Sequence, residues 1–146
     1  LSDEEESEAI LYIKGVKIQL LDFSRNPFGY KLSIPTTNIL CEGIKSPSLL
    51  HLACLKAYAM MYRKKWKDAV DLFFILKEKP DISLDIILNQ TKSLFGPLYK
   101  IEATLETILE NQWDTSESVE YLTEKKGSDD MIQNFLITQA KEYLKR

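Results

Sequence analysis

Charged side chains between residues 56 and 71 have the types and the spacing that could bind a phosphorylated ligand. In the stretch LKAYAMMYRKKWKDAVDLFFIL, residues 55–76, Lys56 and Arg63 stand seven positions apart. A helix places residues at this spacing on nearly the same face, and an unbroken helix would bring Lys67 and Asp71 to that side as well. Two interpretations follow: the cations and carboxylates anchor a pair of helices, or they face a phosphorylated ligand.

The structural interpretation is the commoner one for such a strip, because most charged helix faces are solvated and make weak ion pairs. Lys67 and Asp71 are four positions apart, a spacing that stabilises a helix by a few tenths of a kcal/mol. Asp71 leads into the apolar run 72–76, so we expect it to be either partnered or catalytic. Asp68 is expected to cap a helix. A ligand site would leave Lys56 and Arg63 open to a cleft, whereas a structural network would be buried with its hydrogen bonds satisfied.

The elements that must position these residues are predicted to be a short β-rich part, residues 1–45, and a helical bundle, residues 46–146, within one domain. Lys14-Gly15 separates two β-rich runs and predicts a hairpin with one buried face. The sequence of residues 24–31 predicts a loop. The run from Ile39 to Ile44 predicts an edge strand that bends at Gly43. Cap residues, apolar spacing, Pro and Gly predict helices over residues 46–63, 67–77, 83–95 and 99–111, a short helix after 114, and a last helix after 128.

Composition and charge exclude several classes of protein. The net charge is −3 and the pI is about 5.3, which argues against a protein whose main task is to coat nucleic acid. The apolar runs are too short to cross a bilayer, so no membrane partner is expected. The single histidine, His51, cannot build a histidine-rich metal site, and we expect Cys41 and Cys54 to be reduced thiols in a cytoplasmic protein.

The charged stretch resembles a known enzyme family. Its order is Lys56, Ala59, Arg63, then Lys67-Asp68 and Asp71-Leu72 before an aromatic and aliphatic run. This order, with the upstream segments GVKIQLLDF and EGIKSPSLLHLACLK, is similar to the C-terminal half of the AbiEii/AbiGii toxin family of nucleotidyltransferases, from prokaryotic abortive-infection and toxin–antitoxin systems. The resemblance covers about residues 13 to 78, and the later helices agree only in kind.

The resemblance implies a nucleotidyltransferase-like α+β fold and a transfer of a nucleotide from a nucleoside triphosphate to an RNA or protein acceptor, with magnesium as cofactor. It also implies a cognate antitoxin as a partner. Lys56, Arg63 and Lys67 would contact the triphosphate, and Asp71 would be the catalytic carboxylate, orienting a cation or assisting the acceptor.

The sequence departs from the family at the metal site. The family's Gly-Ser…Asp-x-Asp segment, which holds magnesium, does not occur in these residues, and Gln19 stands where an acidic residue is common. We therefore expect the metal-binding part to lie upstream of this chain, or the protein to be a degenerate relative. Two alternatives stay open beside the enzyme: a non-enzymatic helical interaction module with a structural ion-pair network, and an RNA-binding module that uses residues 63–67.

Overall fold

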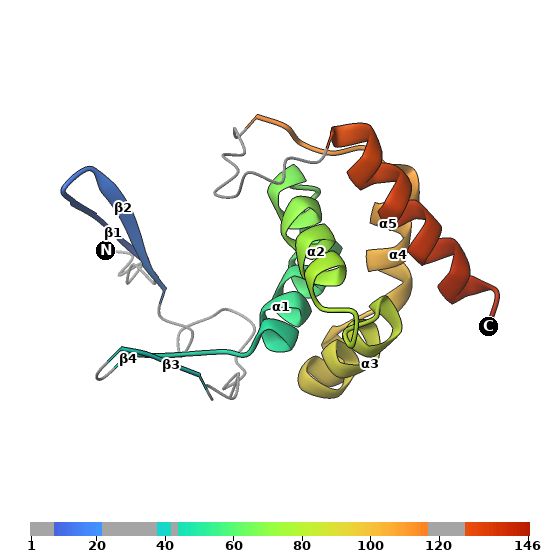
Figure 1. The fold of residues 1–146 in the computed structure, drawn as a ribbon, viewed down its shortest axis with the longest axis horizontal. Coiled ribbons are helices and arrows are strands. Elements are labelled where there is room, and N and C mark those ends of the chain that lie inside the picture. Colours follow the sequence, from blue (N-terminus) through green and yellow to red (C-terminus); the bar gives the residue numbers. More distant parts are fainter. Residues whose placement is uncertain (1–7, 22–37, 42–43, 117–127) are drawn as a thin grey trace, which may run out of the picture. The chain divides into compact units, whose positions relative to one another are not determined.

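The computed structural model describes residues 8–21, 38–41, 44–116 and 128–146. The chain divides into two compact units, Leu1–Ser33 and Ile34–Arg146, and each is described here by itself. The described residues are mainly α-helical, with the five helices in the second unit (Figure 1). The prediction of one domain over residues 1–146 stays a prediction.

The described part of the first unit is the predicted hairpin. Strands β1 (Glu8–Ile13) and β2 (Val16–Leu21) pair antiparallel, with Ile13 opposite Val16. Lys14 and Gly15 form the two-residue connection at φ 49° and 80°. Two successive positive φ angles match the twist of paired strands, and glycine takes the second one without strain. The predicted buried face is not seen at Val16, which is exposed, while Ile18 is partly buried.

The predicted edge strand is instead a second small hairpin. Strands β3 (Asn38–Cys41) and β4 (Ile44–Ser46) pair antiparallel, and the register shifts between Ile39 and Cys41. Both described pairings are two-stranded, so the predicted edge strand is part of a hairpin among the described residues. Gly43, the predicted loop 24–31 and most of the short helix expected after residue 114 lie outside the described residues.

The helices begin and end close to the predicted positions. Their bounds are α1 (Leu49–Tyr62), α2 (Trp66–Glu78), α3 (Leu84–Phe95) with the 3₁₀ turn η2 (Gly96–Leu98), α4 (Ile101–Glu110) and α5 (Asp129–Leu144). The first helix starts later than predicted because Ser48, not Ser46, is its cap and accepts a hydrogen bond from His51 N at 3.2 Å. Ser46 precedes proline, which disfavours helical backbone, and it ends β4.

A break separates α1 from α2 at Arg63–Lys65. Arg63 and Lys65 both have extended backbone, with φ and ψ of −143° and 142° and of −78° and 126°. The chain therefore leaves one helix and starts the next within three residues. Because the turn is this short, the C-terminal end of α1 and the first turn of α2 lie close to each other, and the charged residues at these two ends can meet.

The core forms around α1, which contacts α2, α3 and α4, while α5 contacts α2, α3 and α4. The buried residues of α1 are Ala53, Cys54, Ala57 and Met60. The apolar spacing of residues 55–73 predicts a buried stripe; its members Trp66, Val70 and Phe73 are buried, whereas Tyr62 is exposed. The predicted apolar side of α5 was Met131, Phe135, Ile137 or Leu136, and Leu144. Leu136 is buried together with Ile132 and Ala140, whereas Met131 and Leu144 are exposed. In the described ranges we find no helix with the length and apolarity that a membrane span needs.

Candidate functional site

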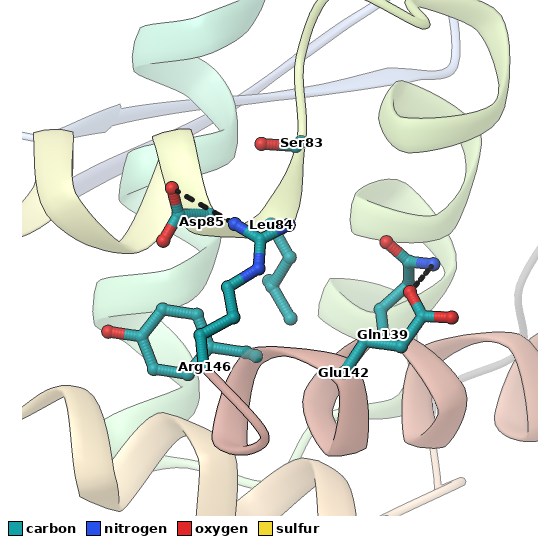
Figure 2. A pocket seen from close by; sticks show the side chains of 7 residues that line it. Ser83, Leu84, Asp85, Gln139, Glu142 and Arg146 are labelled. Carbon is teal, nitrogen blue, oxygen red and sulfur yellow. Dashed lines mark hydrogen bonds and ion pairs between the residues drawn. The ribbon is translucent and has the colours of Figure 1, made fainter.

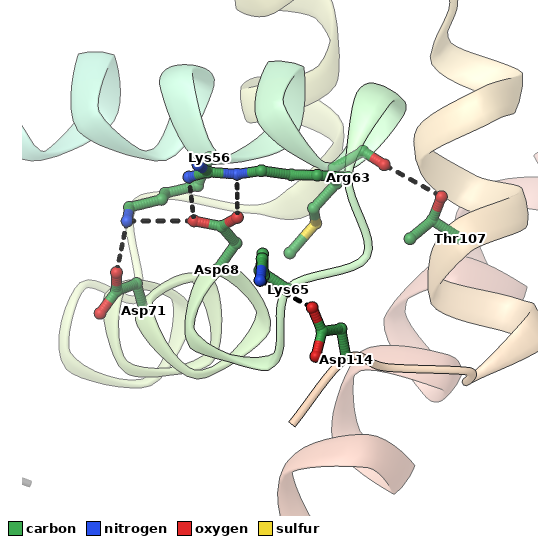
Figure 3. Close-up of polar contacts among 8 residues, drawn as sticks. Lys56, Arg63, Lys65, Asp68, Asp71, Thr107 and Asp114 are labelled. Atoms are coloured by element: carbon green, nitrogen blue, oxygen red, sulfur yellow. Dashed lines mark hydrogen bonds and ion pairs between the residues drawn. The ribbon is translucent and has the colours of Figure 1, made fainter. Parts of the chain in front are cut away.

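Four charged side chains at the junction of α1 and α2 form one connected set of ion pairs (Figure 3). Lys56 lies in the middle of α1, Arg63 follows its last residue, and Asp68 and Asp71 lie in the first two turns of α2. We call Lys56, Arg63, Asp68 and Asp71 the polar cluster. The break at residues 63–65 allows the C-terminal end of α1 and the start of α2 to face each other. The polar cluster therefore forms between two helices and not along one helix face.

Asp68 is the centre of the polar cluster. Its side chain is 0% exposed. Arg63 donates from Nε to Oδ2 at 2.9 Å and from Nη2 to Oδ1 at 3.1 Å, and Lys56 Nζ donates to Oδ1 at 3.2 Å. The two bonds from Arg63 form the bidentate fork that is the strongest arrangement of arginine with a carboxylate. The positive charges of Lys56 and Arg63 thus compensate the buried negative charge of Asp68.

Asp71 occupies the outer side of the polar cluster. Its Oδ2 lies 2.6 Å from Lys56 Nζ, and its side chain is 50% exposed. Lys56 therefore bridges a buried and an exposed carboxylate. The Lys56 and Arg63 side chains keep 28% and 49% of their surface open to solvent.

The structure brings together three of the four residues that the sequence singled out. Lys56, Arg63 and Asp71 belong to the polar cluster, whereas none of its described contacts includes Lys67, which is partly buried. The described ion pair of Asp71 is with Lys56, and the predicted pairing of Lys67 with Asp71 stays a prediction. The helix break rotates α2 relative to α1, so the extrapolation along one continuous helix fails after Arg63.

Asp68 is the residue that sequence reasoning missed. It was expected to cap α2, but Lys65 holds the cap position and the Asp68 carboxylate is directed to Lys56 and Arg63. A signal was available: Asp68, Leu72 and Leu76 are four positions apart and share the buried side of α2. Asp71 was chosen because it adjoins the apolar run, but it lies on the exposed side.

The charges within the polar cluster sum to zero, with two cations and two carboxylates. Burial by itself would lower the pKa of Lys56, but Asp71 and Asp68 together outweigh burial and raise it. Lys56 is therefore held as an ammonium ion. A permanently charged lysine suits an electrostatic role and does not suit a role as a general base.

The basic residues beside the polar cluster are also paired. Lys64 Nζ contacts Glu110, and Lys65 Nζ lies 2.6 Å from Asp114 Oδ2. The backbone adds two hydrogen bonds, from Asp114 N to Lys64 O at 2.6 Å and from Trp66 N to Asp114 O at 3.0 Å. The hydrogen bond from Lys65, with those from Ser116, holds the pKa of Asp114 well below its usual range. The segment after α4 thereby fastens the turn that carries Arg63.

Hydroxyl groups of α4 fix the backbone of α1 beneath the polar cluster. Thr104 Oγ1 donates to Ala57 O at 2.9 Å and accepts from Tyr99 Oη at 2.9 Å. Thr107 Oγ1 lies 3.1 Å from Met60 O (Figure 3). Burial raises the pKa of Tyr99 well above its ordinary value, which keeps this donor protonated. The helix that carries Lys56 is thus held by α2 on one side and by α4 on another.

The described residues do not fit the magnesium ion that the resemblance implies. They contain no group of three His, Cys, Asp or Glu side chains that could hold a metal ion. The two carboxylates of the polar cluster are already bound to cations, with Asp68 buried against Lys56 and Arg63. No magnesium-dependent step is therefore derived from these residues.

A described pocket lies between α3 and α5, apart from the polar cluster (Figure 2). Its polar side chains pair among themselves: Arg146 Nη1 lies 3.6 Å from Asp85 Oδ2, and Gln139 Nε2 donates to Glu142 Oε2 at 3.4 Å. None of the four predicted site residues lines it. We assign no ligand to this pocket.

The remaining sequence candidates have structural roles. His51 Nδ1 lies 3.0 Å from the Oγ of Ser48, the residue that caps α1. Cys54 is buried and free, and burial raises the pKa of its thiol, so it is a poor nucleophile. Trp66 is buried beside Trp113, with ring centroids 6.0 Å apart, so core packing accounts for its position.

Neither family models nor curated proteins nor solved structures gave a match to this chain.

Proposed function

We propose that the helical unit is the phosphate-facing part of a nucleotidyltransferase-like protein of the AbiEii type. The supporting observation is the convergence of Lys56 and Arg63 on the buried carboxylate of Asp68, with Asp71 paired to Lys56 and both cations still partly open to solvent. These are residues of the motif that carries the family resemblance, and they come from two different helices.

In this proposal the polar cluster supplies positioned positive charge to a nucleoside triphosphate. Arg63 is fixed by its two bonds to Asp68, so its orientation is set before a ligand arrives. Lys56 is held as a cation and adds a second contact that does not compete for a metal ion. Magnesium, when bound, would neutralise the phosphates; the described residues contribute cations and no metal ligands. The same proposal includes an RNA or protein that accepts the nucleotide, a cognate antitoxin as partner and a cytoplasmic location.

The second candidate is a non-enzymatic helical interaction module in which the polar cluster only joins α1 to α2. Its supporting observation is the complete burial of Asp68 and the zero net charge of the polar cluster. The RNA-binding alternative has less support, because Lys64 and Lys65 each pair with a carboxylate. It would require those pairs to open, and RNA binding would then fall steeply with salt.

Calorimetry with the four nucleoside triphosphates and magnesium separates the two candidates. The proposal predicts saturable binding by the native protein that is lost in Lys56→Ala and kept in Lys64→Ala. Lys64 is the matched control, a lysine in the break between α1 and α2 that is paired outside the polar cluster. Absence of binding in a folded native sample would overturn the nucleotide proposal and leave the interaction module.

A further inference from the structure

The two carboxylates that pair with Lys56 differ in their burial and in the number of their partners. These two properties decide whether a ligand could replace a carboxylate. Asp68 is completely buried and accepts three hydrogen bonds. Asp71 is half exposed, and the single described contact of its carboxylate is the ion pair with Lys56 at 2.6 Å. Asp71 lies one turn further along α2, where solvent reaches it.

We propose that Asp71 is a displaceable counter-ion, which occupies Lys56 until the triphosphate of a nucleotide takes its place, while Asp68 is the fixed anchor. This inference rests on the proposed function and changes the expected role of Asp71 from catalyst to competitor. Asp71 is then a residue that limits affinity, and its removal has the opposite effect to the removal of Lys56.

The energetics of the two ion pairs favour this division. An exposed ion pair contributes about 0–1 kcal/mol in proteins, so Asp71 can turn into water at small cost. Asp68 has no such freedom, because leaving its partners would strand a buried charge. A phosphate oxygen is an anionic hydrogen-bond acceptor like a carboxylate oxygen. The lysine ammonium has three donors, so Lys56 can bind a phosphate oxygen in place of Asp71 while it keeps its bond to Asp68.

Displacement also follows from charge. A triphosphate that approaches Lys56 meets the negative charge of Asp71, and the two anions compete for one ammonium group. Replacing Asp71 by asparagine removes the repulsion and keeps the size and shape of the side chain. We expect affinity for a triphosphate to rise roughly threefold to tenfold, the range for one charge at a partly exposed site.

The test uses calorimetry on the full chain with two probes, magnesium–ATP and inorganic tripolyphosphate, which has no base or sugar. The variants are Asp71→Asn, Lys56→Ala and Glu110→Gln. Glu110 is the matched control, because it is also a partly exposed carboxylate paired with a lysine. Its partner is Lys64, which lies in the break between α1 and α2. Its substitution changes the net charge equally.

Tighter binding of both probes by Asp71→Asn, with Glu110→Gln unchanged, supports the inference. Unchanged or weaker binding by Asp71→Asn, while the native protein binds saturably, overturns it and leaves the proposed function intact. An equal gain in Glu110→Gln also overturns it, since the effect would then be one of net charge. If neither the native protein nor Asp71→Asn binds either probe, the proposed function and this inference both fail.

Discussion

At the scale of single residues, α2 carries one buried and one exposed aspartate, and the two have different roles. Asp68 and Asp71 share Lys56, but Asp68 also holds Arg63 and has no contact with solvent. The loss of stability on removing a carboxylate depends on whether its cationic partners stay without a counter-charge. Loss of Asp68 leaves two cations at the joint of α1 and α2, whereas loss of Asp71 leaves Lys56 with its other partner.

We expect Asp68→Asn to lower the free energy of unfolding by about 1–3 kcal/mol, since Lys56 and Arg63 are partly exposed and water can compensate some of the loss. Asp71→Asn should lower it by less than about 0.5 kcal/mol. Urea unfolding followed by circular dichroism measures both. Equal costs for the two variants would contradict the role of Asp68 as anchor.

The raised pKa of Lys56 predicts how stability depends on pH. A group whose pKa is raised by folding contributes stability that is complete below its ordinary pKa, here 10.5, and is lost as pH rises through the folded value. The native protein should therefore lose more stability than Lys56→Met when pH is raised from about 9 to about 11.5. Urea midpoints at the two pH values give the comparison. The same loss in both proteins would show that Lys56 does not contribute through its charge.

At the scale of elements, α4 is the support that holds α1 in place. The chain of hydroxyl bonds from Tyr99 to Thr104 to the carbonyl of Ala57 is buried and satisfied, and it joins the turn before α4 to the middle of α1. Among the described residues, no buried side-chain nitrogen or oxygen lacks a partner. A chain of this kind resists partial removal, because each hydroxyl serves its neighbour.

We predict that Thr104→Val destabilises the protein by about 1–3 kcal/mol, because it leaves the buried Tyr99 hydroxyl without a partner and removes the hydrogen bond to the Ala57 carbonyl. Adding Tyr99→Phe should recover part of this loss, since the double variant no longer buries an unpaired hydroxyl. Thermal or urea unfolding of the two single variants and the double variant tests the coupling. Strict additivity of the two losses would contradict it.

The sequence could predict the elements better than the way they meet. The hairpin turn at Lys14-Gly15 and the helix caps Ser83 and Ser128 follow from local chemistry, and the structure confirms them. The buried face of α5 was predicted only in part, with Leu136 buried but Met131 and Leu144 exposed, because periodicity over one helix leaves the buried side uncertain by one position. The role of Asp68 was missed for a related reason: it depends on a three-residue break that sets α2 against α1.

At the scale of the whole molecule, the chain is two units, and the polar cluster lies in one of them. Every contact of the polar cluster among the described residues falls within Ile34–Arg146. The buried apolar residues that are described also belong to this unit, while the described β1–β2 hairpin has exposed residues such as Tyr12 and Val16. A two-stranded hairpin is marginal by itself, whereas five packed helices have their own core.

A fragment of residues 34–146 should therefore fold without the hairpin unit. We expect its urea midpoint and its helical circular dichroism to match those of the whole chain within error, because the helices that form the core are all retained. A fragment that is unfolded, or that has lost cooperative unfolding, would show that the two units form one domain, as the sequence suggested.

The most direct test of the central claim is the nuclear magnetic resonance signal of the Arg63 Nε–H during a titration with magnesium–ATP. The chain has three arginines, Arg25, Arg63 and Arg146, so Arg63→Lys assigns the signal. The account predicts a signal protected from solvent exchange in the free protein, because Nε donates to buried Asp68 at 2.9 Å, and a saturable shift as the nucleotide binds. A rapidly exchanging signal would contradict the anchor, and a protected signal that does not move would contradict the phosphate-facing role.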